Sequence, residues 1–420
     1  MGAGSRHDHY ATTGTANLLA TMLTRGSAGY TKASLAEEVE GMGGSLSTSV
    51  DREVTSLTMN CMRGDVSRAV KVLTDSLSSA TLDSAELELA KMEVQALNDA
   101  GSKDMKGTTM EAVHYNAYRD HQMGQPIRGD PDTVGELSTD SLVNFRGSNY
   151  FGDNIVVVGT GNIDHDSFVQ QVGDGLASVG QKSVGERAGT EKCVYVPALL
   201  MMRDDEMYNA NVGVFFDAPG RKDPDYYAFL LMQHMIGNYR IDKHTEHCND
   251  TLKQYNGMHV MLGDLVDVTL ADCEYKAYSD CGLWGNYIFG NEVFTRNMNF
   301  TGVHIPVNWG EFVNEVEVVR GRNSLWNSLM RTETNVDLNR EIGEQILALG
   351  RRVTRTEVAQ RVSHMDAYHI RHLSNQWFYD SEPSFTNWGA IEQTSSIGSY
   401  KYFKINTLNT VMNCHHSLAS

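Results

Sequence analysis

Cysteine is scarce in this sequence. Six cysteines occur among 420 residues, and no two of them form a CxxC pair of the kind that binds zinc or carries redox chemistry. A sparse set without such pairs favours free, buried thiols in a reducing compartment over a disulfide framework. The cysteines stand at positions 61, 193, 248, 273, 281 and 414.

Long apolar runs are also missing. The sequence has no stretch of about 18 apolar residues, the length that a membrane-spanning helix needs, and runs such as residues 212–216 are strand-sized. We therefore expect no transmembrane segment, so that any membrane association would depend on a partner. The N-terminus shows no signal peptide or Arg-rich presequence, and Arg6 stands where a myristoylation signal has Ser or Thr.

Basic residues are outnumbered. There are 35 Lys and Arg against 53 Asp and Glu, which gives a formal net charge of -18. Because nucleic-acid affinity depends on Lys and Arg neutralising phosphates, this balance argues against a nucleic-acid partner. The hydrophobic share of 41% and the charged share of 21% are those of an ordinary globular protein.

The length predicts more than one domain, because single cores stop growing near about 250–300 residues. Residues 175–191 are rich in Gly, Ser and Lys and lack periodicity, as linkers do. We predict an N-terminal domain over residues 1–180, a linker over 181–194, a C-terminal domain over 195–405 and a tail over 406–420. The second half repeats the plan of the first, which indicates two similar halves of roughly 200 residues.

Hydrophobic periodicity and capping residues predict the elements of both halves. In the first half we expect helices over residues 31–40, 66–77, 83–99, 110–118, 138–145 and after Asp164, with strands over 45–50, 55–62 and 154–158. In the second half we expect strands over residues 211–218, 258–264 and 281–289, with helices over 224–236, 309–322, 339–349 and 365–378. The five tryptophans are predicted to be mostly core, although aromatic enrichment is also typical of obligate interfaces; they are Trp284, Trp309, Trp326, Trp377 and Trp388.

Several short motifs are similar to those of the pitrilysin-type metallopeptidases. They are Gly4-Ser5-Arg6-His7-Asp8, Arg25-Gly26-Ser27, Met42-Gly43-Gly44 and Asp51-Arg52-Glu53 in the first half, and Asp280-Cys281-Gly282-Leu283-Trp284-Gly285, Glu341-Ile342-Gly343, Gly350-Arg351-Arg352 and Gly389-Ala390-Ile391-Glu392-Gln393 in the second. The sequence most resembles the members that form the beta subunit of the mitochondrial processing peptidase and the core subunits of ubiquinol-cytochrome c reductase. This resemblance implies an α+β fold of two homologous domains, each a mixed sheet with helices packed on one face. The Gly-rich loop typical of the alpha subunit is absent from the sequence around residues 250–260, which favours the beta side of the family.

Members of this family carry some tens of residues before the segment that matches Gly4-Ser5-Arg6, including a first strand. We therefore expect either a longer natural N-terminus or another element that covers an otherwise exposed sheet edge.

The resemblance implies a zinc site on the first helix. In active members an H-x-x-E-H motif supplies two zinc ligands and a general base. Here the two His positions are Asn17 and Thr21, the base position is Ala20, and an ungapped count from Thr21 puts Leu97 at the third ligand position. Asn and Thr are weak neutral ligands, and the side chains of Ala and Leu have no donor atom. We therefore expect a degenerate site without catalytic residues, metal or cofactor.

Four other segments invite a functional interpretation, and a structural one is favoured for each. Residues 243–248 read Lys-His-Thr-Glu-His-Cys but lack zincin spacing, and Cys414-His415-His416 lies in a short tail. Gly159-Thr160-Gly161-Asn162 lacks the third Gly and the Lys of a phosphate loop, so that a turn is predicted. His234 stands alone on a predicted helix and is expected to be packed or hydrogen-bonded.

The resemblance implies a non-catalytic, core-one-type subunit that scaffolds the matrix side of the respiratory complex III dimer as a peripheral protein of the mitochondrial inner membrane. The implied partners are a core-two-like homologue, cytochrome b, cytochrome c1 and the iron-sulfur subunit. Such obligate assemblies bury more than about 2,000 Å². The alternative is a presequence-binding or processing subunit of a mitochondrial processing peptidase, for which the acidic balance would attract basic presequences.

Overall fold

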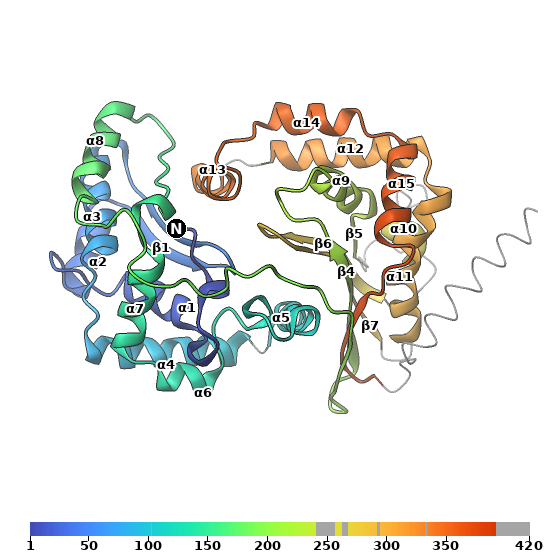
Figure 1. The fold of residues 1–420 in the computed structure, drawn as a ribbon, viewed down its shortest axis with the longest axis horizontal. Helices are drawn as coiled ribbons and strands as arrows, with labels where there is room; N and C mark the ends of the chain where they lie inside the picture. Colours follow the sequence, from blue (N-terminus) through green and yellow to red (C-terminus); the bar gives the residue numbers. More distant parts are fainter. Residues whose placement is uncertain (102, 241–256, 263–267, 292–294, 332–333, 392–420) are drawn as a thin grey trace, which may run out of the picture.

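A computed structural model of the protein describes residues 1–101, 103–240, 257–262, 268–291, 295–331 and 334–391. The chain forms two parts that lie side by side (Figure 1). The segment from residue 176 to residue 198 joins them and contains no helix or strand. The remainder of the chain lies outside the described residues, including the segments 243–248 and 414–416, for which a structural interpretation is favoured over a metal site.

The first part is mainly helical. Thr31, Ser138 and Asp164 accept hydrogen bonds from the third residue along, which explains why helices begin where the sequence predicted. Its only sheet within the described residues is an antiparallel hairpin in which Ser45 pairs with Asn60. The elements are α1 (Thr15–Met22), α2 (Lys32–Gly41), β1 (Ser45–Val50), β2 (Thr55–Asn60), α3 (Val66–Ser78), α4 (Ser84–Gly101), α5 (Met105–Tyr118), α6 (Pro131–Glu136), α7 (Thr139–Asn149) and α8 (His165–Gly175).

The strand predicted over residues 154–158 is wrong, because this segment is not part of a sheet. Its β-branched residues favour extended backbone, but a strand also needs a hydrogen-bonded neighbour. We expected a mixed sheet in each part. Within the described residues, the first part has the two-stranded hairpin alone, and the mixed sheet, with six strands, lies in the second part.

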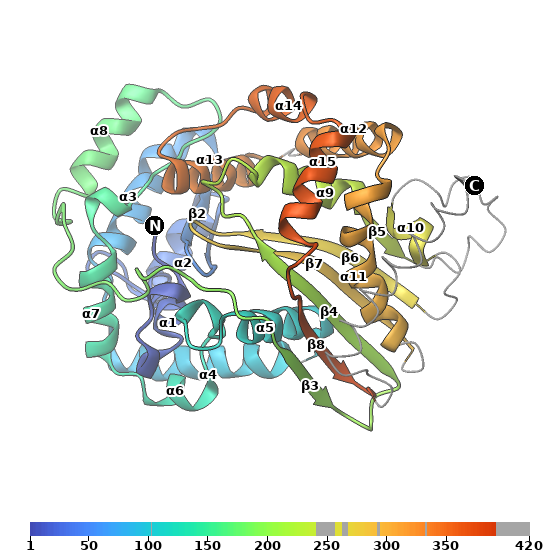
Figure 2. The same cartoon turned by 45° about the vertical axis from the view of Figure 1, so that its right-hand side comes forward.

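The sheet of the second part has the strand order β3-β8-β4-β7-β6-β5. β3 and β8 are parallel, and the other neighbours are antiparallel. Helices α9, α11, α12 and α15 cover one face (Figure 2). The elements are β3 (Leu199–Arg203), β4 (Asn209–Ala218), α9 (Tyr226–Ile236), β5 (Asn238–Arg240), α10 (Gly257–Leu262), β6 (Val268–Ala277), β7 (Gly282–Asn291), α11 (Thr295–Phe312), α12 (Glu315–Met330), α13 (Asn335–Leu349), α14 (Arg355–Ser363), α15 (Ala367–Trp377) and β8 (Ser384–Gly389).

Two predictions for this part are corrected. Residues 257–262 form helix α10 rather than the beginning of a strand, because a short apolar run does not distinguish the two. The single helix predicted over residues 309–322 is divided between α11 and α12. The division occurs because Asn314 and Glu317 form a reciprocal capping box that begins a new helix.

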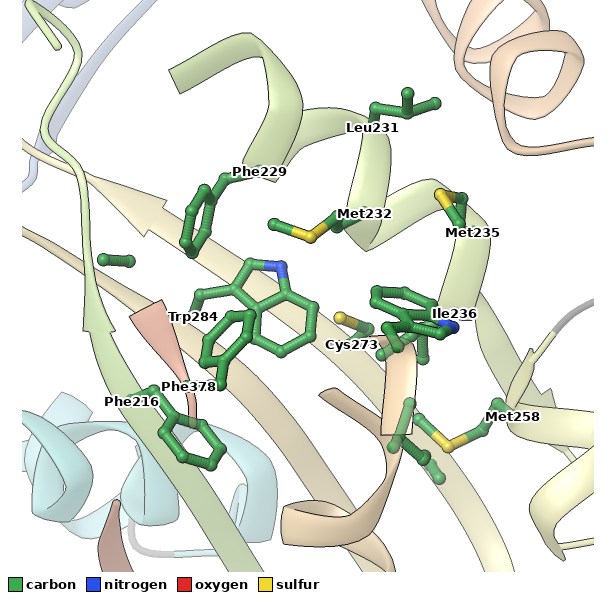
Figure 3. Packing of buried hydrophobic residues seen from close by; sticks show 14 of the residues in the cluster. Phe216, Phe229, Leu231, Met232, Met235, Ile236, Met258, Cys273, Trp284 and Phe378 are labelled. Carbon is green, nitrogen blue, oxygen red and sulfur yellow. The ribbon is translucent and has the colours of Figure 1, made fainter. Parts of the chain in front are cut away.

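The core lies between the sheet and these helices. Trp284 is fully buried and packs against Phe229 and Phe378, with ring centroids 6.2 and 5.1 Å away (Figure 3). Of the other tryptophans, Trp309 is buried while Trp326 is 40% exposed. Trp377 and Trp388 are half-buried, so the prediction that most of the five tryptophans are core is confirmed only for Trp284 and Trp309.

The opposite face of this sheet is covered by a helix of the first part. In β4 the side chain of Phe215 points away from the main core and packs, with Leu283 of β7, against Val113 and Ala117 of α5. Asn116 of α5 donates hydrogen bonds to the carbonyl groups of Ala198 and Phe385. The sheet is therefore buried on both faces only because α5 crosses from the first part, as Figure 1 shows.

Helix α13 makes the reverse crossing. Figure 2 shows it beside the hairpin of the first part, where Arg340 donates to the Ser49 hydroxyl at 3.4 Å. The Thr160 hydroxyl of the first part donates to the backbone carbonyl of Asn335 at 3.2 Å. Each part thus contributes one helix to the other.

Candidate functional site

Helix α1 carries the positions that correspond to a metal site. Leu18, Leu19 and Ala20 are buried, and Asn17 and Thr21 are half-buried on the same side of the helix. The Thr21 hydroxyl donates to the backbone carbonyl of Asn17 at 3.0 Å, which is a bond within the helix. Ala20 offers no atom that could accept a proton, so α1 does not fit a zinc ion or a general base.

The start of α1 is held by a buried carboxyl group. Asp8 accepts hydrogen bonds from the backbone amides of Gly14 and Ala16 at 2.8 and 2.9 Å. Burial raises the pKa of Asp8 to about 8, although these two amides act in the opposite direction. Gly14 has a φ of 90°, and a Cβ there would lie 2.8 Å from the Arg128 carbonyl oxygen, so the turn requires glycine.

The end of α1 is joined to α4 by an arginine. Arg25 donates to Glu86 at 2.9 Å and to Glu93. Leu97, which the ungapped count selected, is 48% exposed and lies one helical turn beyond Glu93 on α4. This carboxylate pair is not among the predicted site residues, and its signal in the sequence is the spacing of seven residues that places Glu86 and Glu93 on one helical face.

Throughout the described residues, no group of three or more His, Cys, Asp or Glu side chains could hold a metal ion. The two carboxylates of α4 share the single positive charge of the Arg25 guanidinium group, and the Arg25 side chain is 7% exposed. This arrangement joins the end of α1 to α4, and the side chains of Glu86 and Glu93 remain 29% and 53% exposed.

An apolar cavity of about 370 Å³ lies between β2 and residues 155–163. Its lining is largely aliphatic and includes Leu57, Val70 and Leu73 together with Phe168 and residues of α13. The turn at residues 159–162 forms part of this wall. Thr160 uses its hydroxyl to contact Asn335, as described above.

Motifs that are far apart in the sequence meet at a buried arginine. The guanidinium group of Arg6 donates to Glu53 at 2.8 Å and to both carboxylate oxygens of Asp280 at 2.6 and 2.7 Å. It also donates to the backbone carbonyls of Gly189 and Glu191 in the connecting segment. Burial alone would raise the pKa of Asp280, but the bond from Arg6 and its charge lower that pKa to about 2.

A second buried group lies next to this one. Arg52 donates to the Met123 carbonyl and to Glu111 at 2.7 Å. His114 Nε2 lies 2.7 Å from the Tyr278 hydroxyl, and burial keeps the pKa of His114 well below its ordinary value. These contacts tie α5 to the turn before β7 and make this region an interface between the two parts.

His234 has a structural role, as predicted. Its Nδ1 lies 3.4 Å from the Ser324 hydroxyl, which joins α9 to α12. Burial lowers the pKa of His234. Within the described residues, no helix is both long enough and apolar enough to cross a membrane.

Comparison with known proteins identifies the family. The family described as "Insulinase (Peptidase family M16)" matches residues 1–131, and the family described as "Peptidase M16 inactive domain" matches residues 136–293. The beta subunit of the mitochondrial-processing peptidase of Neurospora crassa is 25% identical over 414 residues, which are 96% of this chain and 84% of that protein. The human beta subunit is 26% identical over 407 residues, 93% of this chain and 79% of that protein.

A solved structure has the same fold. A chain of complex III2 from Candida albicans, with Inz-5 bound, superposes with a TM-score of 0.83 at 19% identity and covers 96% of this chain and 92% of that one. The fold is therefore shared over nearly the whole length. Because the two M16 descriptions together match more than half of the residues, the chain belongs to peptidase family M16, the insulinase family.

Proposed function

We propose that this protein is a non-catalytic core subunit of respiratory complex III. The observation that carries the proposal is the chemistry of α1, where the hydroxyl of Thr21 is bonded to the helix backbone and Ala20 replaces the general base. The match to an inactive M16 domain and the similarity to a complex III chain support it. In this role the protein would contribute surface and rigidity rather than chemistry.

An exposed apolar stripe on α12 supports assembly into a complex. Val316, Val319, Trp326 and Met330 are 58%, 42%, 40% and 56% exposed, and their spacing places them on one side of the helix. Exposed groups of this kind mark protein interaction sites, in which aromatic residues are enriched. We propose that a homologous core-two-like subunit covers this stripe.

The remaining partners and the location follow from the same assignment. The proposed partners are cytochrome b, cytochrome c1 and the iron-sulfur subunit, and the proposed location is the matrix side of the mitochondrial inner membrane. The proposed domains cover residues 1–180 and 195–405, with a linker over residues 181–194. In this division helix α5 of the first domain packs on the second domain, and helix α13 of the second domain packs on the first. The alternative is a presequence-binding or processing role, supported by the 25–26% identity to processing-peptidase beta subunits.

Blue-native electrophoresis of solubilised mitochondrial membranes tests the assignment. We expect the protein in the band that oxidises ubiquinol, in a stoichiometric ratio to cytochrome b by mass spectrometry. Recovery of the protein only as a soluble heterodimer would contradict the scaffold role and favour presequence binding or processing.

A variant tests the proposed interface. We expect Trp326→Glu to lower incorporation into the complex by at least about tenfold, the factor given by about 1.4 kcal/mol of lost contact free energy. The matched control is Val184→Glu, because Val184 is 87% exposed and lies in the connecting segment. Equal incorporation of both variants would exclude the α12 stripe as the interface.

A further inference from the structure

Two free cysteines lie together at the junction of the two parts. Cys193 belongs to the connecting segment, and Cys281 directly precedes β7. Both are buried, at 4% and 6% exposure, in the apolar cluster that also contains Phe215 and Leu283. Their proximity comes from the fold, since they are far apart in the sequence.

The backbone holds the two cysteines in place. The amide of Cys193 donates to the Asp280 carboxylate at 3.2 Å, across 87 residues of sequence. Asp280 is adjacent to Cys281 and is itself fixed by Arg6. Next to Cys193, the His121 ring lies 3.3 Å from the Glu191 carbonyl oxygen. The connecting segment is therefore held against the turn that carries Cys281.

The two thiols differ in acidity. A bond from the Cys281 thiol, together with His121 and Arg6, lowers the pKa of Cys193 in spite of burial. The neighbouring Cys193 sulfur and burial raise the pKa of Cys281. Because the thiolate is the nucleophile in disulfide exchange, Cys193 is the attacking group of the pair.

The other two described cysteines lack this environment. Burial raises the pKa of Cys273, which lies in the main core. Burial and the charge of Asp65 raise the pKa of Cys61. The contrast makes both residues suitable controls.

We propose that Cys193 and Cys281 are a redox-active dithiol that small disulfides, such as oxidised glutathione, convert to an intramolecular disulfide. The Cys193 thiolate attacks the small disulfide, which forms a mixed disulfide and releases one thiolate. Cys281 then loses its proton and attacks the Cys193 sulfur, which releases the second small thiol. Two protein thiols are thereby oxidised, and one small disulfide is reduced to two thiols.

The connecting segment gives the oxidant access. Residues 189–198 contain no helix or strand, and Val194, next to Cys193, is 66% exposed. A local opening of this segment exposes Cys193 without unfolding the sheet. Closure of the disulfide then fastens the segment covalently to the second part and restricts movement between the two parts.

Oxidation of the full chain in a glutathione redox buffer tests the proposal. After alkylation and proteolysis, we expect a peptide linking Cys193 to Cys281 in the disulfide form and no link to Cys61 or Cys273. The variant Cys281→Ser, if folded by circular dichroism, should accumulate a glutathione adduct at Cys193, because the second step is blocked. The variant Cys273→Ser should behave as the wild type does.

Two results would overturn the proposal. One is a folded wild-type protein in which Cys193 and Cys281 both stay alkylatable across the range of redox buffers. The other is a folded Cys281→Ser variant in which glutathione adds to Cys61 in preference to Cys193. Neither result depends on assembly into a complex, so the test is independent of the proposed function.

Discussion

At the scale of single residues, Arg6 joins three distant stretches of the chain through one guanidinium group. Its side chain is 5% exposed and contacts Glu53, Asp280 and the connecting segment. A buried charge of this kind is costly unless all its partners are present. Removal of Arg6 therefore leaves two carboxylates in a partly buried site without a cation.

We expect Arg6→Met to lower the free energy of unfolding by about 3–5 kcal/mol, the cost typical of breaking a buried ion pair. Denaturation in urea, followed by circular dichroism, measures the change. The control is Arg68→Met, because Arg68 is 48% exposed and its surface pairs with Glu38 and Asp65 contribute little to stability. A loss for Arg6→Met no larger than that of the control would contradict the role given to Arg6.

The same contact predicts a pH dependence. The pKa of Asp280 is about 2 in the folded protein against an ordinary value of 3.8, so the folded state binds this proton less readily than the unfolded state. The stabilisation is therefore present above about pH 4 and is lost as the pH falls toward 2. We expect Arg6→Met to weaken this slope in acid denaturation curves, and an unchanged slope would show that other carboxyl groups cause it.

The residues of the degenerate site illustrate what the sequence could reveal. Asn17, Ala20 and Thr21 are located by the resemblance to the family motif, whose positions lie within a single helix and therefore depend only on local spacing. The partners of Arg25 could not be found by counting, because insertions and deletions shift positions between elements while contacts in space are kept. The convergence of Arg6 and Asp280 was hidden for the same reason.

At the scale of elements, the close approach of β7 to β4 depends on glycine. A Cβ at Gly285 would lie 2.0 Å from the Val214 carbonyl oxygen and 2.7 Å from the Cα of Phe215. Both are backbone atoms, which cannot move aside as a flexible side chain can. The sheet would have to shift to accept any other residue.

We expect Gly285→Ala to destabilise the protein by at least about 1–3 kcal/mol, the usual cost of overpacking. Gly343→Ala is the matched control, since a Cβ there meets only Val158 at 3.8 Å. In the interior of α13, alanine should stabilise by about 1 kcal/mol. Thermal denaturation of both variants measures the effect, and a similar loss in both would point to a general effect of replacing glycine.

Sequence patterns located most helices, because capping residues and apolar periodicity act within a few residues. Strands were wrongly predicted at residues 154–158 and 258–264, because the apolar residues of these segments suit a strand by composition. Whether such a segment becomes a strand depends on a neighbour with free backbone groups, which the local sequence does not encode. The crossing of α5 to the second sheet is likewise a property of tertiary packing.

At the scale of the whole molecule, the helix exchange makes the two parts mutually dependent. Val113 of α5 is fully buried against the second sheet, whereas Tyr115 on the same helix is 49% exposed. We expect Val113→Asp to separate the parts, because an unpaired charge would be buried there. The connecting segment over residues 176–198 should then be cleaved faster in limited proteolysis, while the Tyr115→Asp variant should resist cleavage as the wild type does. Equal cleavage of both variants would argue against α5 as the joint.

The path of α5 also bears on the order of events during synthesis and import. Residues 105–118 precede β4 and β7 in the chain, so this helix is synthesised and imported before the sheet that covers it. Until the later strands arrive, its apolar side remains open to other molecules, and such surfaces lead to aggregation. A chain of this design should therefore need a chaperone during the interval between the arrival of its first and second parts.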